Sequence, residues 1–221
     1  MKRLQKLLMA IVIIIVNTQC NNIATAKNEV DDGVEDYINK DYAGAYKLLT
    51  KNSTTKDFEH NPQASYVLGN MYYLGEGGAS KNYVEASKWY NKAAANGNVE
   101  AMHNIAVIYQ DGGSGVTANF EEALKWYHKA AEKGFVSSQL NLGIIYQNGE
   151  KVKQDFAEAL KWYNKAAEQN SAAAQYDLAT MYANGNGVEK NEKEALRYLR
   201  LAAEQGMPEA KELLKKMGVA E

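Results

Sequence analysis

The chain of 221 residues contains a single cysteine, Cys20, which stands within the first 26 residues. If the chain is cut after Ala26, no cysteine remains, and a disulfide framework is excluded. A hydrophobic core must then hold the fold by itself. A chain of this length can bury roughly 70% of the surface that it exposes when unfolded, so such a core is feasible.

A long hydrophobic run is also missing. The apolar stretch over residues 7–16 follows three basic residues and is much shorter than the about 20 residues that span a membrane. Ala24 and Ala26 supply small residues that a signal peptidase reads. We therefore predict a cleaved signal peptide over residues 1–26 and an exported chain, periplasmic in preference to secreted, whose mature part does not insert into a membrane. Lipidation of Cys20 and an uncleaved anchor are the alternatives.

An excess of positive charge is absent as well. The first 26 residues hold three of the 25 Lys and Arg residues and none of the 27 Asp and Glu residues, so the rest of the chain carries a net charge near −5. No run of Lys or Arg interleaves with aromatic residues, as a nucleic-acid surface would require. We therefore expect no nucleic acid among the partners.

Residues typical of catalytic or metal sites are sparse and scattered. The three histidines, His60, His103 and His128, do not cluster, and the positions equivalent to His128 in other copies of the repeat described below hold Asn91 and Asn164. That exchange favours a surface position for His128. No metal-binding spacing of His or Cys and no nucleophile elbow is found. We predict no catalytic residue, no metal ligand, no cofactor and no enzyme.

What the chain does have is one motif repeated four times. The aromatic residue at the same place in each copy is Trp89, Trp126, Trp162 and Tyr198, at intervals of 37, 36 and 36 residues. That period is the repeat length of an α-solenoid. We predict repeats over about residues 61–98, 99–135, 136–171 and 172–206. A divergent helical cap and polar joint over residues 27–60 precede them, and a capping helix over residues 207–221 follows.

Each copy predicts two helices. The first, helix A, carries Leu or Ile, then Gly or Ala, then Tyr three residues later, and the small residue indicates close helix packing. The second, helix B, starts at a short polar residue three places before a glutamate. This is a capping-box arrangement, in which each side chain satisfies a free backbone N–H of the first turn. The pairs are Asn82 with Glu85, Asn119 with Glu122, Asp155 with Glu158, and Asn191 with Glu194.

The pattern Ala-x-x-x-Leu-Gly-x-x-Tyr-x-x-Gly-x-Gly-Val, followed by Ala-x-x-Trp-Tyr-x-Lys-Ala-Ala-x-x-Gly, resembles that of Sel-1-like repeats, which are relatives of tetratricopeptide repeats. Residues 62–207 carry it, and the last copy departs from it at residues 197–199. The resemblance implies an all-α fold, a right-handed α-solenoid of tandem helix-turn-helix repeats. Its A helices are implied to line a concave surface that holds another polypeptide.

The resemblance also implies which residues face the partner. They lie two before, two after and five after the Leu or Ile anchor of each helix A, and none of them is Lys or Arg, so capture of an acidic chain terminus is not expected. Their mixture of aromatic, aliphatic and amide groups suits a protein contact. They are Tyr66, Asn70, Tyr73, His103, Val107, Gln110, Leu140, Ile144, Gln147, Tyr176 and Thr180.

The residues that recur in the motif are expected to form the core between repeats. Trp126→Ala is accordingly expected to cost about 3–5 kcal/mol, as truncation of a buried aromatic residue does. The expected core residues are Leu68, Gly69, Tyr72, Trp89, Tyr90, Tyr109, Trp126, Tyr127, Leu142, Gly143, Tyr146, Trp162, Tyr163, Leu178, Tyr182 and Tyr198.

These features favour an exported, non-enzymatic scaffold or adaptor that binds a partner protein or peptide on its concave face; the partner and the oligomeric state stay open. One alternative is a protein that binds cell-wall glycan or peptidoglycan by stacking sugars on Trp and Tyr. Another is a periplasmic immunity protein that neutralises a toxic effector. A cysteine-rich branch of the resembled family has been linked to β-lactam binding or hydrolysis, but its disulfide in each repeat is absent here.

Overall fold

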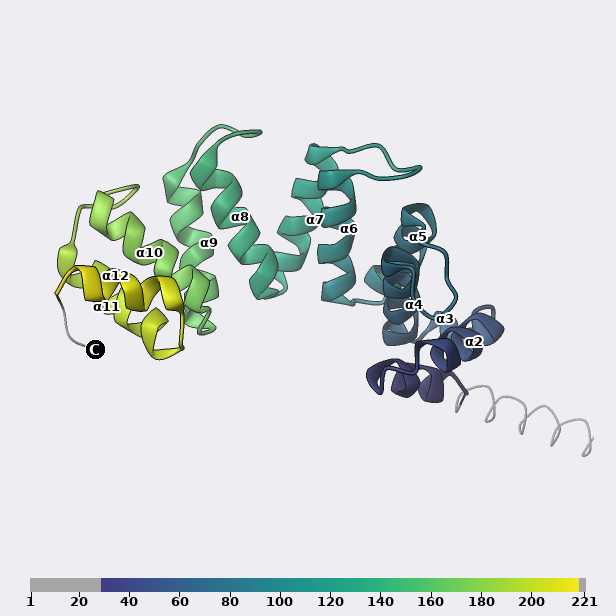
Figure 1. Ribbon diagram of the computed structural model, residues 1–221. Coiled ribbons are helices and arrows are strands. Elements are labelled where there is room, and N and C mark those ends of the chain that lie inside the picture. The colour runs from purple at the N-terminus through teal and green to yellow at the C-terminus, as the bar shows by residue number, and fades with distance from the viewer. Residues whose placement is uncertain (1–28, 219–221) are drawn as a thin grey trace, which may run out of the picture. The chain divides into compact units, whose positions relative to one another are not determined.

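The computed structural model describes residues 29–218, so the predicted signal peptide and Cys20 lie outside the described residues. Within that range every regular element is a helix (Figure 1), and the prediction of an all-α solenoid of tandem repeats is confirmed. Residues 29–38 are helical. The later helices are α2 (Tyr42–Asn52), α3 (Lys56–Glu59), α4 (Pro62–Leu74), α5 (Tyr83–Ala95), α6 (Val99–Asp111), α7 (Phe120–Glu132), α8 (Val136–Asn148), α9 (Phe156–Glu168), α10 (Ala172–Asn184), α11 (Glu192–Glu204) and α12 (Pro208–Lys216).

The helix pairs of the repeats are regular. Helices α4, α6, α8 and α10 stand at the predicted A positions, and α5, α7, α9 and α11 stand at the predicted B positions. All eight have 13 residues. Because the lengths are equal, residues with the same place in the motif occupy the same place along their helices.

The described chain forms two compact units. The first contains residues 29–101 and 113–117, and within it α4 packs against α5, α2 and α3. Its core includes Leu49, Phe58, Leu68 and Met71. The Phe58 ring meets the ring of Trp89 edge-on, with 5.5 Å between the centroids.

The second unit contains residues 102–112 and the described residues from 118 onward. Each helix from α7 to α11 packs against the next one along the chain (Figure 1). The apolar core of this unit continues from one repeat to the following one. Its successive clusters include Tyr127 and Leu142, then Tyr163 and Leu178, then Leu199 and Leu214.

The B helices begin as predicted in one respect and differently in another. The side-chain oxygens of Asn82, Asn119, Asp155 and Asn191 accept hydrogen bonds from the backbone N–H three residues later, which confirms the caps. The prediction that the glutamate side chain bonds to the backbone N–H of the capping residue is wrong. Each glutamate instead forms an ion pair with the Lys or Arg three residues later.

The backbone N–H of each capping residue has another acceptor. It donates to the carbonyl oxygen of the motif tyrosine in the preceding helix A, at 2.7 to 2.9 Å. The last four carbonyls of a helix have no partner within that helix, so this bond satisfies one of them and fixes where helix B starts relative to helix A. The pairs are Asn82 with Tyr72, Asn119 with Tyr109, Asp155 with Tyr146, and Asn191 with Tyr182.

The Lys-Trp-Tyr motif of helix B buries its tyrosine more uniformly than its tryptophan. Tyr90, Tyr127 and Tyr163 are fully buried, whereas Trp162 is the one tryptophan that is buried and Trp89 and Trp126 are half-buried. The buried tyrosine rings explain the small residue of helix A. A Cβ on Gly69 or Gly143 would collide with the ring of Tyr90 or Tyr163.

Candidate functional site

The partner-facing positions predicted on α4 are engaged within the first unit. The rings of Tyr66 and Tyr90 lie 6.0 Å apart, and those of Tyr73 and Tyr83 lie 5.3 Å apart, between centroids. The hydroxyl of Tyr90 donates to Asn70 Oδ1 at 2.7 Å. Tyr66, Asn70 and Tyr73 are therefore half-buried parts of an aromatic cluster.

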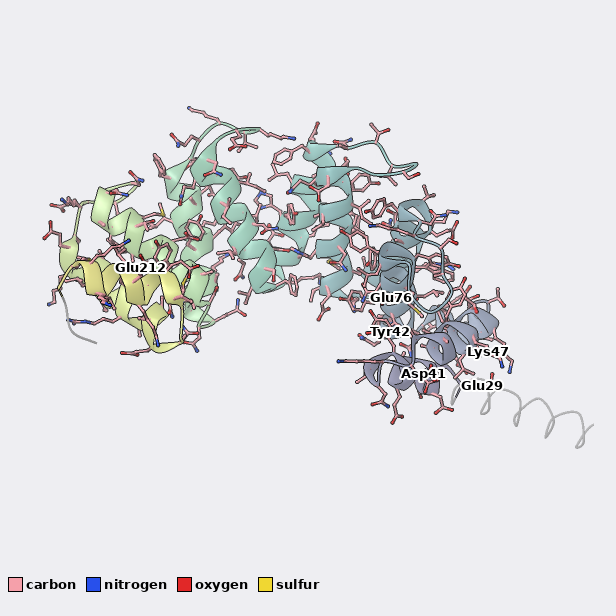
Figure 2. The ribbon with its side chains drawn as sticks, in the orientation of Figure 1. Glu29, Asp41, Tyr42, Lys47, Glu76 and Glu212 are labelled. Atoms are coloured by element: carbon pink, nitrogen blue, oxygen red, sulfur yellow. The ribbon has the colours of Figure 1, made fainter. Side chains whose placement is uncertain are left out.

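The N-terminal helix approaches the same positions. Burial raises the pKa of Tyr37, the charge of Glu76 raises it further, and a hydrogen bond with Asn70 lowers it, so Tyr37 lies beside α4. Tyr37 also packs on the ring of Tyr42 at 5.3 Å. Figure 2 shows Tyr42 near Glu76, and the loop after α4 touches the Tyr42 carbonyl. This contact reduces the surface that α4 offers to a partner.

The predicted positions on α6 divide between packing and exposure. Nδ1 of His103 lies 2.9 Å from the hydroxyl of Ser138 on α8, and the His103 ring packs between Tyr127 and Phe135. Burial lowers the pKa of His103, because it disfavours the charged ring. Val107 packs against the core of the second unit. The side chain of Gln110 is half-buried and accepts a hydrogen bond from the Tyr127 hydroxyl at 3.1 Å.

The most accessible predicted position lies on α8. Ile144 is 40% exposed, although it is a large aliphatic residue. It lines a pocket of about 300 Å³ that also contains Gln110, so the fold brings together two predicted positions from consecutive repeats. The other lining residues are Asp111, Phe120, Asn141, Ile145, Asn148, Glu150 and Lys151.

Sequence reasoning missed most of this lining. Asn141 stands one residue before the Leu142 anchor, outside the three offsets that the resemblance supplied. Glu150 and Lys151 come from the loop after α8, and Nζ of Lys151 lies 5.4 Å from the centre of the Phe120 ring. Only the packing of that loop beside the start of α7 brings them to the pocket.

The remaining predicted positions lie along α8 and α10. Leu140 packs against the cluster around Tyr163, and Tyr176 packs against the cluster around Leu199. Thr180 donates its hydroxyl hydrogen to the Asp177 carbonyl at 2.8 Å and lines a second pocket of about 250 Å³, with apolar residues of α11 and α12. Gln147 is half-buried on the side of α8 that carries Gly143 and the Tyr163 ring.

We call the side of the A helices in the second unit that carries these predicted positions the A-helix face. It also holds Asp177, which sequence reasoning did not select. Burial raises the pKa of Asp177 to about 6. Burial also raises the pKa of Tyr163, with a further contribution from the charge of Asp177, so the two groups are close. Asp177 is thus a half-buried acid, whereas the predicted positions on this face carry no Asp, Glu, Lys or Arg.

His128 is not the surface residue that its exchange with asparagine indicated. Its Nε2 lies 3.0 Å from the hydroxyl of Tyr146, and its ring meets that of Trp162 at 5.5 Å between centroids. Burial lowers its pKa. His128 thus packs between neighbouring repeats, where an amide can replace it because both side chains are planar and polar.

Among residues 29–218, no three His, Cys, Asp or Glu side chains gather as a metal site would require. No helix in the same range has both the length and the apolar character needed to cross a membrane.

The model of the Sel1 repeat family matches four consecutive segments of the chain, residues 62–98, 99–135, 136–171 and 172–207. Each matched segment contains one A helix and one B helix. The comparison with the curated proteins gives no match.

Solved structures extend the comparison. A Sel1 repeat protein from Oxalobacter formigenes is similar with 36% identity and a TM-score of 0.74, over 82% of this chain and 70% of that one. A protective antigen of uropathogenic Escherichia coli with an SLR fold is similar with 31% identity and a TM-score of 0.77, over 90% of this chain and 43% of that one. An immunity protein from Pseudomonas aeruginosa shares the fold at 21% identity and a TM-score of 0.51, over 82% and 67%.

Proposed function

The chain belongs to the Sel1 repeat family, and we propose that it is an exported, non-enzymatic scaffold that holds a partner polypeptide on its A-helix face. The observation that carries this proposal is the pocket of about 300 Å³ beside Ile144. The pocket is lined by residues of two consecutive repeats, as expected of a surface that binds an extended polypeptide.

The chemistry of the pocket supports a polypeptide ligand. Ile144, Ile145 and Phe120 provide apolar surface that a partner side chain can cover. The amides of Gln110, Asn141 and Asn148 can donate to and accept from a peptide backbone. Apolar surface with a few placed polar groups is the usual composition of a ligand pocket.

Glycan binding through tryptophan is less well supported. A lysine three residues later lies over each tryptophan ring, at 4.2 Å for Trp89, 4.0 Å for Trp126 and 4.3 Å for Trp162, measured from Nζ to the ring centre. A sugar would have to displace that lysine before it could stack on the ring. The second pocket, beside Thr180, is lined mainly by apolar side chains and does not resemble a sugar site.

The proposal is tested by crosslinking and capture from an envelope fraction with the parent chain and two variants. Ile144→Lys places a charge at the pocket, whereas Ile38→Lys makes the same change at a residue that is 69% exposed in the first unit. We expect one protein to be recovered with the parent and with Ile38→Lys and to be lost with Ile144→Lys.

Equal recovery with Ile144→Lys would contradict the proposal, as would recovery of wall fragments in place of protein. The identity of the captured protein would also separate an adaptor from an immunity protein, because the latter would capture a toxic effector.

A further inference from the structure

The loops that follow the A helices pack on the start of an earlier helix. In three of the four loops a glycine lies against the first residue of that helix, so closely that a Cβ on the glycine would collide with it. Each of these loops therefore covers the residue that it contacts. The pairs are Gly77 with Tyr42 of α2, Gly113 with Tyr83 of α5, and Gly187 with Phe156 of α9.

The loop after α8 packs differently. It has the same length as the loop after α10, and Lys151 has the place of Gly187. Gly187 has a φ of +71°, and a Cβ there would lie 2.7 Å from Cβ of Phe156 and 2.9 Å from its carbonyl oxygen. A lysine meets both obstacles, because residues with a side chain rarely adopt a positive φ and because its Cβ would need that space. The backbone of Lys151 accordingly does not adopt a positive φ.

The pocket of about 300 Å³ lies where the path of this loop differs. Phe120 is the first residue of α7, as Phe156 is of α9. The loop after α10 lies on Phe156, whereas Phe120 lines the pocket together with Glu150 and Lys151 of the loop after α8. The exchange of glycine for lysine thus accounts for the open space beside Phe120.

The lining of this pocket carries more negative than positive charge. Asp111 and Glu150 are exposed, and neither forms an ion pair with a Lys or Arg among residues 29–218. Lys151 is the one basic residue of the lining, so the two acids leave it with one net negative charge. Complementary charge favours the encounter with a partner and selects between partners. A segment with a basic residue therefore fits this pocket better than an acidic segment does.

We propose that Lys151 holds the pocket open and that the pocket takes an apolar side chain of the partner polypeptide, next to a basic residue that pairs with Asp111 or Glu150. This inference rests on the proposed function and names the chemistry of the partner. Ile144 and Ile145 offer the apolar contact. The Cβ of residue 151, not the ammonium, keeps the loop from settling on Phe120. Alanine would therefore hold the pocket open as well, and it would remove a charge that repels the basic residue.

Chemical labelling of a single thiol tests the role of Lys151. Residues 27–221 contain no cysteine, so Ile144→Cys introduces the only thiol into the chain without residues 1–26. Its labelling rate is measured with a cationic and with an anionic methanethiosulfonate reagent, each relative to the rate on a small free thiol. The measurement is made with Lys, Ala and Gly at position 151.

The three residues at position 151 should give three different results. Lys151→Gly lets the loop settle on Phe120, so both reagents should react about 10-fold more slowly, because the loop must open first. Lys151→Ala should leave the pocket open and speed the cationic reagent relative to the anionic one. Glu168→Cys, at an exposed position on α9, should label each reagent at the same rate in all three backgrounds, because the rest of the unit keeps its fold. An unchanged rate at residue 144 on Lys151→Gly, or an equal slowing on Lys151→Ala, would overturn the role of Lys151.

Selection from a random displayed-peptide library tests the chemistry of the partner. Against the chain without residues 1–26, we expect peptides that share an apolar residue next to Lys or Arg. Their affinity should fall about 10-fold on Lys151→Gly, where the loop must be opened, and rise about 2- to 3-fold on Lys151→Ala, where a like charge is removed. Selected peptides without a basic residue, or an equal affinity for Lys151→Gly and the parent, would overturn the inference and leave the proposed function standing. A library that yields no binder would contradict the proposed function itself.

Discussion

Tyr127 and Tyr163 are the same residue at the same place in two repeats, and both rings are fully buried. Their hydroxyls nevertheless stand in different surroundings, since the Tyr127 hydroxyl has a bond to Gln110 and the Tyr163 hydroxyl has none in the described chain. The two repeats therefore differ at one atom, because one buried hydroxyl is paired and the other is not.

Removing the two hydroxyls should therefore have different effects on stability. Tyr127→Phe breaks a bond and leaves Gln110 with one partner fewer, so we expect a loss of about 1 kcal/mol in the free energy of unfolding. Tyr163→Phe removes an unsatisfied group and should leave stability unchanged or raise it by up to about 1 kcal/mol. Urea unfolding of the parent and both variants measures the two values. A larger loss for Tyr163→Phe would show that its hydroxyl is paired in solution.

Asp177 gives stability an unusual dependence on pH. Burial raises its pKa to about 6 in the folded chain, above the value of about 4 that an exposed aspartate has. Between these values the folded state binds more protons than the unfolded state, so this group lowers the free energy of unfolding as the pH rises from about 4 through about 6.

The Asp177→Asn variant lacks this effect. We expect it to be more stable than the parent at pH 7 by about 1–2 kcal/mol, a figure reduced from the full shift because the side chain is only half-buried. The gain should shrink as the pH falls below about 5. Unfolding free energies of both proteins at several pH values test this expectation, which a pH-independent difference would contradict.

At the scale of the helix, the sequence predicted the caps correctly because a cap depends on residues close together in the chain. Asn119 and Glu122 suffice to place the start of α7. The reciprocal glutamate bond failed because the N–H of Asn119 meets the carbonyl of Tyr109 on the preceding helix, and a local pattern does not contain that neighbour. The same limit applies to His128, whose contacts with Tyr146 and Trp162 come from the following repeat.

The tryptophans of the B helices should likewise differ in their contribution to packing. Trp162 is 2% exposed and joins the core cluster of the preceding repeat, so Trp162→Ala is expected to cost about 3–5 kcal/mol. Trp126 is half-buried with Lys129 over its ring, so Trp126→Ala should cost less than the sequence alone suggested, about 1–2 kcal/mol. Thermal or urea unfolding of the pair gives the comparison. Equal losses would mean that Trp126 is as buried in solution as Trp162.

At the scale of the molecule, the fold was predictable because the 36-residue period specifies which helices are adjacent. Part of the pocket lining was predictable too, since Gln110 and Ile144 were selected by offset from their anchors and line one pocket. The rest of the site depends on distant neighbours. Lys151 reaches the pocket through a loop, and the influence of the Asp177 charge on the buried Tyr163 hydroxyl arises only because the fold brings α9 and α10 together.

Photocrosslinking in the native cell tests most directly whether the A-helix face holds the partner. A photoreactive amino acid is placed at residue 144 or, as a control, at residue 161 on the exposed surface of α9. The A-helix face is predicted to give one protein adduct from position 144 that position 161 does not give. Identical adducts from both positions, or an adduct from position 161 alone, would contradict the claim that this face holds the partner.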